Sequence, residues 1–480
     1  MFKVGSKVRS SGGRLFDVRD SSILAVRTAA SSTTVTLTVR AYTGGPATIL
    51  WGDGSQQFVT VPSTGAAGET RYTHLYLTAG VYTIGVASAV DFKMLTASYA
   101  YKYNAGYYRK NLEYILHSGN LLTLQDVIPD YAQRYKYLSI DSGNALVDLS
   151  KLSLESCESF QVRPTATSVV GNPSIRSTSK LTTFYYYNYY ATQVSVDLHE
   201  LVARNPNLSI LEVAYCDGAK VGYEDISDLQ LPEGIASFVT YSSTRYCGDG
   251  AIVVSLFNRS PTFTRLMLTG CQVDGTLLSG DYYAKDGSFY LFNSGGTVGV
   301  KGDASALSFR FRLSDFRISF AQGSFGDISA NLPNLNRDGS PQGSNLYLYN
   351  YGDVELNVAQ LALILRPPLR IVLRDYTGRW YGDASPISSM VTVRTFDLEK
   401  LDSPLITGWA ELVDGLYANR AQFSPLPKTF NCSTAMRKTL KGTYQAPEGY
   451  VKGAADGAPS TSREKLYVLV NSYGWTFTNI

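Results

Sequence analysis

The sequence predicts a mainly β protein in which a small N-terminal β-sandwich precedes a long solenoid of stacked coils. Two observations lead to this prediction. Short runs of β-branched residues alternate with polar residues near the N-terminus. Further on, one short apolar motif recurs at a nearly constant interval. A third observation, a helix-like segment followed by a strand-like segment at the end of the chain, predicts a C-terminal cap.

The N-terminal region, residues 22–90, contains several strand-like runs and one marked turn. In Trp51-Gly52-Asp53-Gly54 a strand enters a tight turn, because glycine tolerates positive φ and aspartate bonds the turn backbone. His74-Leu75-Tyr76 and Gly80-Val81-Tyr82 follow. These segments, in this order, resemble the polycystic-kidney-disease-type (PKD) domain, with its pattern WGDG, HxY and GxYxxxV. The resemblance implies a seven-stranded immunoglobulin-like sandwich, with Asp53 capping a turn and His74 packing, rather than a metal or acid–base pair.

The following region is organised by a repeated motif of the form L-x-x-L-x-L. Its central positions are Phe160, Phe184, Leu211, Phe238 and Leu266. Their period of about 27 residues falls within that of leucine-rich repeats. Over about residues 130–420 the chain resembles the divergent leucine-rich-repeat proteins of gut bacteria and their phages. Cys216 and Cys271 take the position that holds Asn or Cys in that pattern, which implies structural thiols.

Later repeats are looser but continue the pattern. A longer interval between Phe309 and Leu346 contains residues 331–344, which we interpret as an inserted loop. Residues 197–203 and 357–363 are typical of helices on the convex side. Further strands are expected at 135–140, 288–292, 307–311, 345–349, 369–373 and 393–398. A parallel β-helix or a chain of sandwiches is the competing architecture.

The C-terminal end predicts a cap. Residues 403–430 have the composition of the end of an array, residues 434–440 of a short helix, and residues 442–462 of a loop. Residues 462–471 predict a helix that ends at Gly474 before a strand at 475–480, similar to the cap of Bacteroidetes-associated repeat proteins. The predicted domains are an N-terminal arm (1–21), the sandwich (22–90), a connecting segment (91–134), the solenoid (135–420) and the cap (421–480).

Composition argues against most kinds of chemistry. The net charge is +3, and no basic run suggests nucleic-acid binding. The three histidines lie in separate segments, outside any metal-ligand pattern, and the five cysteines are widely spaced. We therefore expect no enzyme activity, no metal and no cofactor. A glycan depolymerase stays open as an alternative, because its two carboxylates can come from distant coils.

Tyrosine provides the candidate binding residues. The chain has 35 tyrosines, and strand alternation places Phe184 and Tyr186 inward and Tyr185 and Tyr187 outward. An outward ladder across the concave sheet is expected from Tyr185, Tyr187, Tyr215, Tyr241, Tyr347 and Tyr349. The alternative is that tyrosine pairs across strands simply stabilise the sheet.

These features suggest a bacteriophage virion structural protein of the tail, fibre or head decoration. The N-terminus lacks the apolar core of a signal peptide, and no uninterrupted apolar stretch is long enough to span a bilayer, so we expect synthesis in the host cytoplasm without membrane insertion. The expected partners are other virion proteins and a host-surface protein or glycan, with the chain oligomeric in the assembly. Besides a depolymerase, a bacterial surface adhesin or an intracellular repeat scaffold is an alternative.

Overall fold

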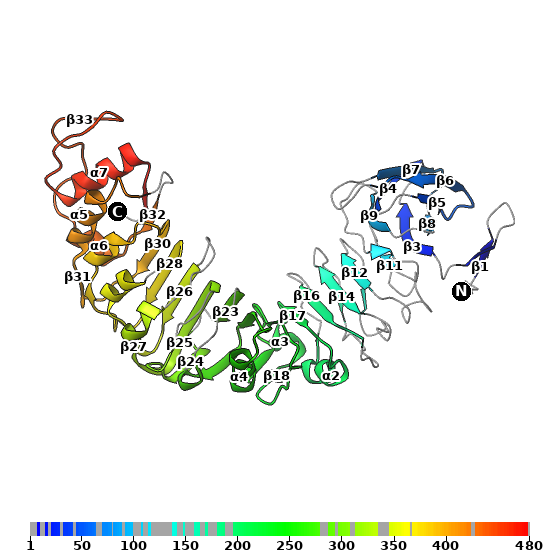
Figure 1. Ribbon diagram of the computed structural model, residues 1–480, viewed down its shortest axis with the longest axis horizontal. Coiled ribbons are helices and arrows are strands. Elements are labelled where there is room, and N and C mark those ends of the chain that lie inside the picture. The colour runs from blue at the N-terminus through cyan, green and yellow to red at the C-terminus, as the bar shows by residue number, and fades with distance from the viewer. Residues whose placement is uncertain are drawn as a thin grey trace. The chain divides into compact units, whose positions relative to one another are not determined.

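The computed structural model is mostly β and contains a large parallel sheet (Figure 1). The chain divides into two compact units, Met1–Glu224 with Leu229–Arg245, and Asp225–Asp228 with Tyr246–Ile480. The structure describes residues 7–9, 15–17, 21–28, 32–41, 45–63, 70–78, 80–88, 92–98, 107–108, 114–116, 137–141, 147–148, 158–163, 169–170, 180–187, 195–278, 287–292, 296–307, 313–334, 345–364, 367–423 and 428–478.

The first unit begins with antiparallel strands. One sheet has the order β6-β5-β8-β3 and the other β7-β4-β9-β10. Their bounds are β3 (Ser21–Thr28), β4 (Thr33–Ala41), β5 (Gly45–Leu50), β6 (Gln56–Val61), β7 (Thr70–Tyr76), β8 (Gly80–Ser88), β9 (Phe92–Ser98) and β10 (Tyr107–Tyr108). Val35 and Leu37 on β4, and Ala47 and Ile49 on β5, are buried at alternate positions, as the period of a strand requires. A separate pair is formed by β1 (Lys7–Arg9) and β2 (Leu15–Asp17).

The turn after β5 is tied to β7. Trp51 is buried, and its carbonyl accepts a 2.5 Å hydrogen bond from the Tyr76 hydroxyl. Asp53 caps the turn by accepting from the Ser55 amide at 3.0 Å, as expected. The structure adds a contact that the sequence did not suggest, because Asp53 Oδ2 lies 2.7 Å from His74 Nε2 while the His74 ring stacks on Trp51. Although burial favours the neutral acid, the hydrogen bonds from Ser55 and His74 hold the pKa of Asp53 below its usual value.

Parallel pairing follows in the same unit. β3 pairs in parallel with β11, and the row continues through β12, β14, β16, β17 and β19. Phe160, Phe184, Leu211 and Phe238, four of the predicted central positions, are in register and fully buried. The bounds are β11 (Tyr114–Leu116), β12 (Tyr137–Asp141), β14 (Ser159–Arg163), β16 (Thr183–Tyr187), β17 (Ile210–Ala214) and β19 (Ser237–Val239).

Shorter elements connect the strands of the first unit. β13 (Val147–Asp148) and β15 (Val169–Val170) pair with each other. Helix α2 (Leu198–Arg204) begins after its N-cap Asp197, as predicted, and α3 (Gly218–Val221) follows β17. β18 (Glu224–Asp225) lies where the chain passes between the units.

The second unit has its own row of parallel strands in chain order. They are β21 (Arg265–Leu268), β23 (Gly287–Leu291), β25 (Leu313–Asp327), β26 (Asn345–Asn350), β28 (Arg370–Asp375), β30 (Thr395–Lys400), β32 (Thr429–Asn431) and β35 (Thr476–Thr478). Phenylalanine rings stack from coil to coil in its core, with centroids 5.7 Å apart for Phe289 and Phe316 and 4.6 Å apart for Phe396 and Phe430.

Short strands and helices precede and connect the strands of this row. Parallel pairs join β20 (Tyr246–Asp249), β22 (Cys271–Asp274), β24 (Gly299–Asp303), the end of β25 and β27 (Asp353–Glu355), and also β29 (Gly382–Asp383) with β31 (Ile406–Thr407). The helices are α4 (Ala251–Arg259), η4 (Gly275–Leu278), η5 (Ser329–Asn334), η6 (Val358–Leu363), η7 (Ser385–Ser389), α5 (Trp409–Ala418), α6 (Thr434–Thr439) and α7 (Ser462–Tyr473). An antiparallel pair, β33 (Tyr450–Val451) and β34 (Ala455–Asp456), precedes α7.

A repeated turn, which we call the Gly-Asp turn, fixes one coil of this unit onto the next. An aspartate accepts hydrogen bonds from the amide two residues later, as Asp303 does from Ser305 and Asp383 from Ser385, both at 2.9 Å. The residue before it is often a glycine at positive φ that lies against the acidic or amide side chain of the preceding coil. A Cβ on Gly326 would lie 2.6 Å from Asp303 Oδ1. The sequence analysis did not recognise this motif, which recurs at Asp225, Asp249, Asp274, Asp303, Asp327, Asn357 and Asp383.

Several predicted boundaries differ from the structure. Leu307 lies outside any strand, residues 308–311 lie outside the described residues, and the strand of that coil is β25. Phe316 rather than Phe309 pairs with Leu346, so the true interval is shorter than the predicted one. Residues 358–363 form a 3₁₀ helix, and α5 was not expected. The predicted cap helices and final strand are present, but β32 and β35 join the parallel row beyond residue 420.

Candidate functional site

The outward face of the parallel row in the first unit carries four of the six predicted tyrosines. On β16, Phe184 and Tyr186 are fully buried, while Tyr185 and Tyr187 are half-buried on the other face. This alternation confirms the predicted inward and outward directions. Tyr215 and Tyr241 follow the next two strands of the row, β17 and β19, and both are half-buried.

These four residues form one connected group, which we call the tyrosine cluster. The Tyr185 and Tyr187 rings are stacked with centroids 5.9 Å apart. Tyr187 meets Tyr215 edge-on at 5.2 Å, and Tyr215 meets Tyr241 edge-on at 5.8 Å. The Tyr187 and Tyr215 hydroxyl oxygens lie 3.5 Å apart. The cluster therefore spans three neighbouring strands with aromatic contacts of favourable geometry.

Backbone strain places one ring of the cluster. Tyr215 has φ +63°, a conformation that costs an L-residue about 1–2 kcal/mol. Its amide donates to the Tyr241 carbonyl at 3.0 Å, which holds the turn against the neighbouring coil. Ser242, at the equivalent place one coil later, has φ +51°.

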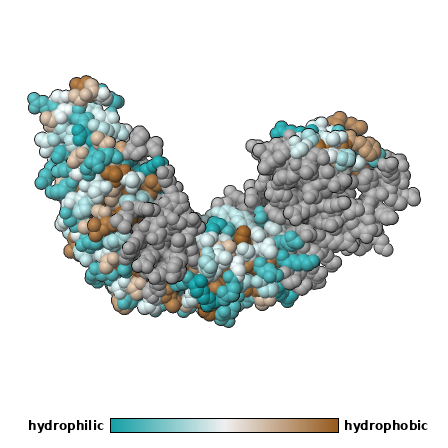
Figure 2. All heavy atoms as spheres, in the orientation of Figure 1, coloured by the Kyte–Doolittle hydropathy of each residue, from teal (hydrophilic) through white to brown (hydrophobic). Residues whose placement is uncertain are grey.

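The surroundings of the tyrosine cluster combine polar side chains with the apolar Ile210 and the buried Val239, which pairs with Glu212. Gln161 pairs with Tyr185 in the sheet register, and Tyr185 pairs with Glu212. The Glu212 carboxylate is buried and accepts a 2.7 Å hydrogen bond from Ser237 Oγ. Among the described residues of this unit, the large exposed hydrophobic side chains are Phe58, Leu75, Leu77 and Tyr223. The first three lie in or beside β6 and β7, where Figure 2 shows hydrophobic surface.

The other two predicted tyrosines lie in the second unit and have different surroundings. Tyr347 on β26 is only 8% exposed, because the Arg317 guanidinium lies between its ring and that of Tyr290, at 4.2 and 4.5 Å. Asp315 binds Arg317 through both carboxylate oxygens, at 3.1 and 2.9 Å, and accepts a hydrogen bond from the Tyr290 hydroxyl. Burial and Asp315 both raise the pKa of Tyr290. Tyr347 is thus part of a closed stack with little surface to offer a ligand.

Tyr349 lies one position further along the same face. Its ring meets Phe292 at 4.7 Å, and the Arg374 guanidinium lies 5.5 Å from its centroid. Arg374 in turn forms a 3.0 Å ion pair with Asp397. Burial raises the pKa of Tyr349. The sequence analysis missed these arginines, although Tyr347, Tyr349 and Tyr351 recur with period two on one strand and Arg370 and Arg374 share a face of the next.

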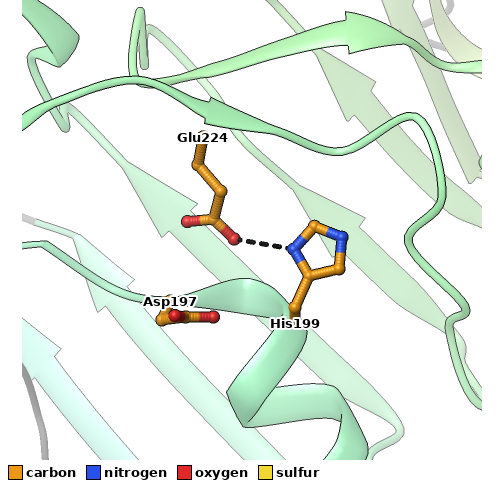
Figure 3. A group of neighbouring side chains, drawn as sticks. All are labelled: Asp197, His199 and Glu224. Atoms are coloured by element: carbon orange, nitrogen blue, oxygen red, sulfur yellow. Dashed lines mark hydrogen bonds and ion pairs between the residues drawn. The ribbon is translucent and has the colours of Figure 1, made fainter.

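A second group, near α2 in the first unit, has metal-ligand chemistry (Figure 3). Donor atoms of Asp197, His199 and Glu224 lie within 4.8 Å of one another. Both carboxylates already have structural partners. Glu224 accepts from the Leu198 amide at 2.7 Å and from Arg245 at 3.1 Å, with His199 Nδ1 at 3.2 Å. Asp197 caps the helix by accepting from the Glu200 amide. These contacts explain the cluster as an anchor for α2.

Lys428, in the second unit, is a buried cation at the start of β32. Its ammonium donates to the Val391 and Val393 carbonyls, both at 2.7 Å, and lies 3.7 Å from the Phe423 ring centroid. Only 2% of the residue is exposed, and burial lowers its pKa to about 7. The ammonium ties β32 to the segment that precedes β30.

Four of the five cysteines lie among the described residues. Cys216, Cys271 and Cys432 are buried, Cys247 is partly exposed, and all four carry thiols rather than disulfides. Burial is the largest of the effects that raise the pKa of Cys271 to about 12, which disfavours the reactive thiolate. Its thiol contacts the Tyr246 carbonyl at 3.9 Å. Cys157 lies outside the described residues.

Comparisons with known proteins provide no relatives. The chain has no match among protein-family models, curated protein sequences or solved structures. Among the described residues, no helix has the length and apolar character needed to cross a membrane.

Proposed function

We propose that the chain is a non-catalytic contact protein of a bacteriophage virion, in the tail, fibre or head decoration. Its N-terminal antiparallel sheets are the proposed PKD-type sandwich, and the two rows of parallel strands are the proposed leucine-rich-repeat-like solenoid. The observation that supports a binding role is the outward face of these strands, where tyrosine and arginine side chains gather coil after coil. Aromatic residues and arginine are the side chains that contribute most to protein recognition surfaces.

The state of the carboxylates favours binding over catalysis. A glycosidase needs one carboxyl group that can donate a proton and a second that attacks or activates water. On the outward face of the second unit, Asp315 is held by Arg317, and Asp397 is held by Arg374. In the first unit, Glu212 is buried and bonded to Ser237. These contacts already occupy the carboxylate oxygens, so these groups are poor candidates for acid–base work.

Mass spectrometry of virions purified from phage lysates tests the virion assignment. We expect peptides of the chain to copurify with infectious particles through density-gradient banding. If the protein stays in the soluble or membrane fraction of the host while other virion proteins band normally, the assignment is wrong, and an adhesin or scaffold becomes the better explanation. Release of reducing sugar from host glycan by the purified chain would instead identify a depolymerase.

A further inference from the structure

The tyrosine cluster contains a residue that the turn itself does not require. Tyr215 and Ser242 each lie four residues after core positions, Leu211 and Phe238, that pair in the sheet. Both adopt positive φ. Because serine occupies this position in the second of the two coils, the turn requires the positive φ but does not require an aromatic side chain. The ring at 215 is therefore an additional feature, kept at a position where a bulky residue is strained.

The strain has a visible result. It turns the Tyr215 ring into the space between Tyr187 and Tyr241, where it makes both edge-on contacts. Among the described residues, the Tyr215 ring links Tyr187 to Tyr241. The cluster is consequently a continuous aromatic strip that follows β16 from Tyr185 to Tyr187 and then crosses to the ends of β17 and β19, with centroids 5.2 to 5.9 Å apart.

The chemistry around the strip favours one class of ligand. A protein interface combines aromatic anchors with other apolar side chains at its centre. Among the described residues of this unit, three of the four large exposed hydrophobic side chains, Phe58, Leu75 and Leu77, are in or beside β6 and β7, and the fourth is Tyr223. Beside the strip lie the polar residues Gln161, Glu212 and Ser237, together with Ile210 and the buried Val239. Tyrosine rings offer an apolar face beside polar groups, which matches a sugar ring, with its C–H face and its hydroxyl rim.

We propose that the tyrosine cluster is a binding site for a neutral glycan chain, with successive sugar units lying along the strip from Tyr185 to Tyr241. The inference rests on the proposed function, because it gives the partner-binding face its ligand class. From Tyr187 through Tyr215 to Tyr241 the rings lie 5.2 and 5.8 Å apart, close to the spacing of neighbouring strands, about 4.8 Å, and comparable with the length of one sugar unit in an extended chain.

Isothermal titration calorimetry of the full chain with neutral hexasaccharides (maltohexaose, cellohexaose, mannohexaose and chitohexaose) tests the proposal. We expect at least one of them to bind. Tyr187→Ala and Tyr215→Ala should each weaken that binding about tenfold or more, the loss expected for one stacked ring. Tyr187→Phe should retain most of the affinity because the ring remains. Tyr223→Ala removes a tyrosine that is 67% exposed and lies outside the cluster, and should leave binding unchanged.

Tyr215→Gly separates binding from folding. Glycine adopts positive φ without strain, so this variant should keep or raise the urea midpoint while losing hexasaccharide binding. If none of the hexasaccharides binds at millimolar concentration, or if both alanine variants bind like the parent, the glycan proposal is wrong. If no hexasaccharide binds but Tyr215→Gly abolishes incorporation into virions, the cluster contacts another protein.

The two proposals fail in different experiments. A chain that is present in purified virions but binds no hexasaccharide overturns only the ligand class. A chain that binds a hexasaccharide through Tyr187 and Tyr215 but is missing from virions overturns only the virion assignment.

Discussion

Gly382→Ala is expected to destabilise the second unit more strongly than alanine at another glycine with positive φ. Gly382 has φ +101°, and a Cβ there would lie 2.2 Å from Asn357 Oδ1 of the preceding coil. Gly378 has φ +73° and nothing within 4 Å of its Cβ position. Both variants bear the backbone strain of a positive φ, about 1–2 kcal/mol. Only Gly382→Ala adds steric overlap, which costs about 1–3 kcal/mol further.

Urea unfolding followed by tryptophan fluorescence measures this difference. Trp380 and Trp409 are fully buried in the second unit and report its unfolding. With an unchanged m-value, the difference in midpoint gives the difference in the free energy of unfolding. Gly378→Ala should lower this free energy by about 1–2 kcal/mol and Gly382→Ala by about 2–5 kcal/mol.

A second substitution tests the stated cause. Asn357→Ala removes the atom that the new Cβ would strike, and also the hydrogen bond that the Ala359 amide donates to Asn357 Oδ1, at a cost of about 1 kcal/mol. Because the overlap disappears, Asn357→Ala should cost less in the Gly382→Ala background than in the parent. Equal effects of Gly382→Ala and Gly378→Ala, or strict additivity of Gly382→Ala and Asn357→Ala in the double variant, would refute the close contact of Gly382 with Asn357 as the cause.

Three further predictions concern ionisable groups. The pKa of Asp53 is held below 3.8, so the ionised carboxylate stabilises the folded chain, and this stabilisation should be lost as the pH falls through the lowered pKa. Asp53→Asn weakens the link to His74 and removes the titrating group, so the acid-dependent fall in the urea midpoint should be absent from this variant. The pKa of Lys428 is lowered from 10.5 to about 7, so between pH 7 and pH 10.5 the unfolded chain binds one proton more than the folded chain at this side chain. The free energy of unfolding should therefore rise from pH 7 to pH 10.5, and Lys428→Met should flatten that rise. Glu224→Gln should lower the free energy of unfolding by about 3–5 kcal/mol, measured by thermal or urea unfolding, because it leaves Arg245 charged and buried. A double variant with Arg245→Met should recover part of this loss, and no recovery would contradict the pairing of Glu224 with Arg245.

The sequence predicted the sheet register where apolar residues recur at one period. Phe160, Phe184 and Leu211 are each followed two positions later by an apolar or aromatic residue, Val162, Tyr186 and Val213, so their shared face follows from strand geometry. The same reasoning placed the wrong phenylalanine, Phe309, opposite Leu346, because either of two aromatic runs satisfied the pattern.

The candidate site was only partly predictable. Alternation along β16 was enough to place Tyr185 and Tyr187 outward, and the repeat period brought Tyr215 and Tyr241 beside them. The same argument could not show that Tyr347 is covered, because its exposure depends on Arg317, whose side chain reaches it from the neighbouring strand. The Gly-Asp turn was missed for a related reason. Its glycine is needed because a side chain of the preceding coil lies against it, and that contact cannot be deduced from the sequence of one coil.

The Gly-Asp turn bears on how an array of this kind can change its length. In the turns at Asp249, Asp303, Asp327 and Asp383, a glycine admits a side chain of the preceding turn, and the turn at Asn357 is joined to the one before it by a hydrogen bond from the Asn357 amide to Ser329 Oγ, 2.7 Å long. The number of residues between successive turns varies, and is smaller from Asp303 to Asp327 than from Asp327 to Asn357. Duplication or deletion of a whole coil would preserve the contacts between neighbouring turns, whereas deletion of part of a coil would remove the contact of one turn with the next. Growth and shortening in whole coils is thus the route of change that this architecture tolerates.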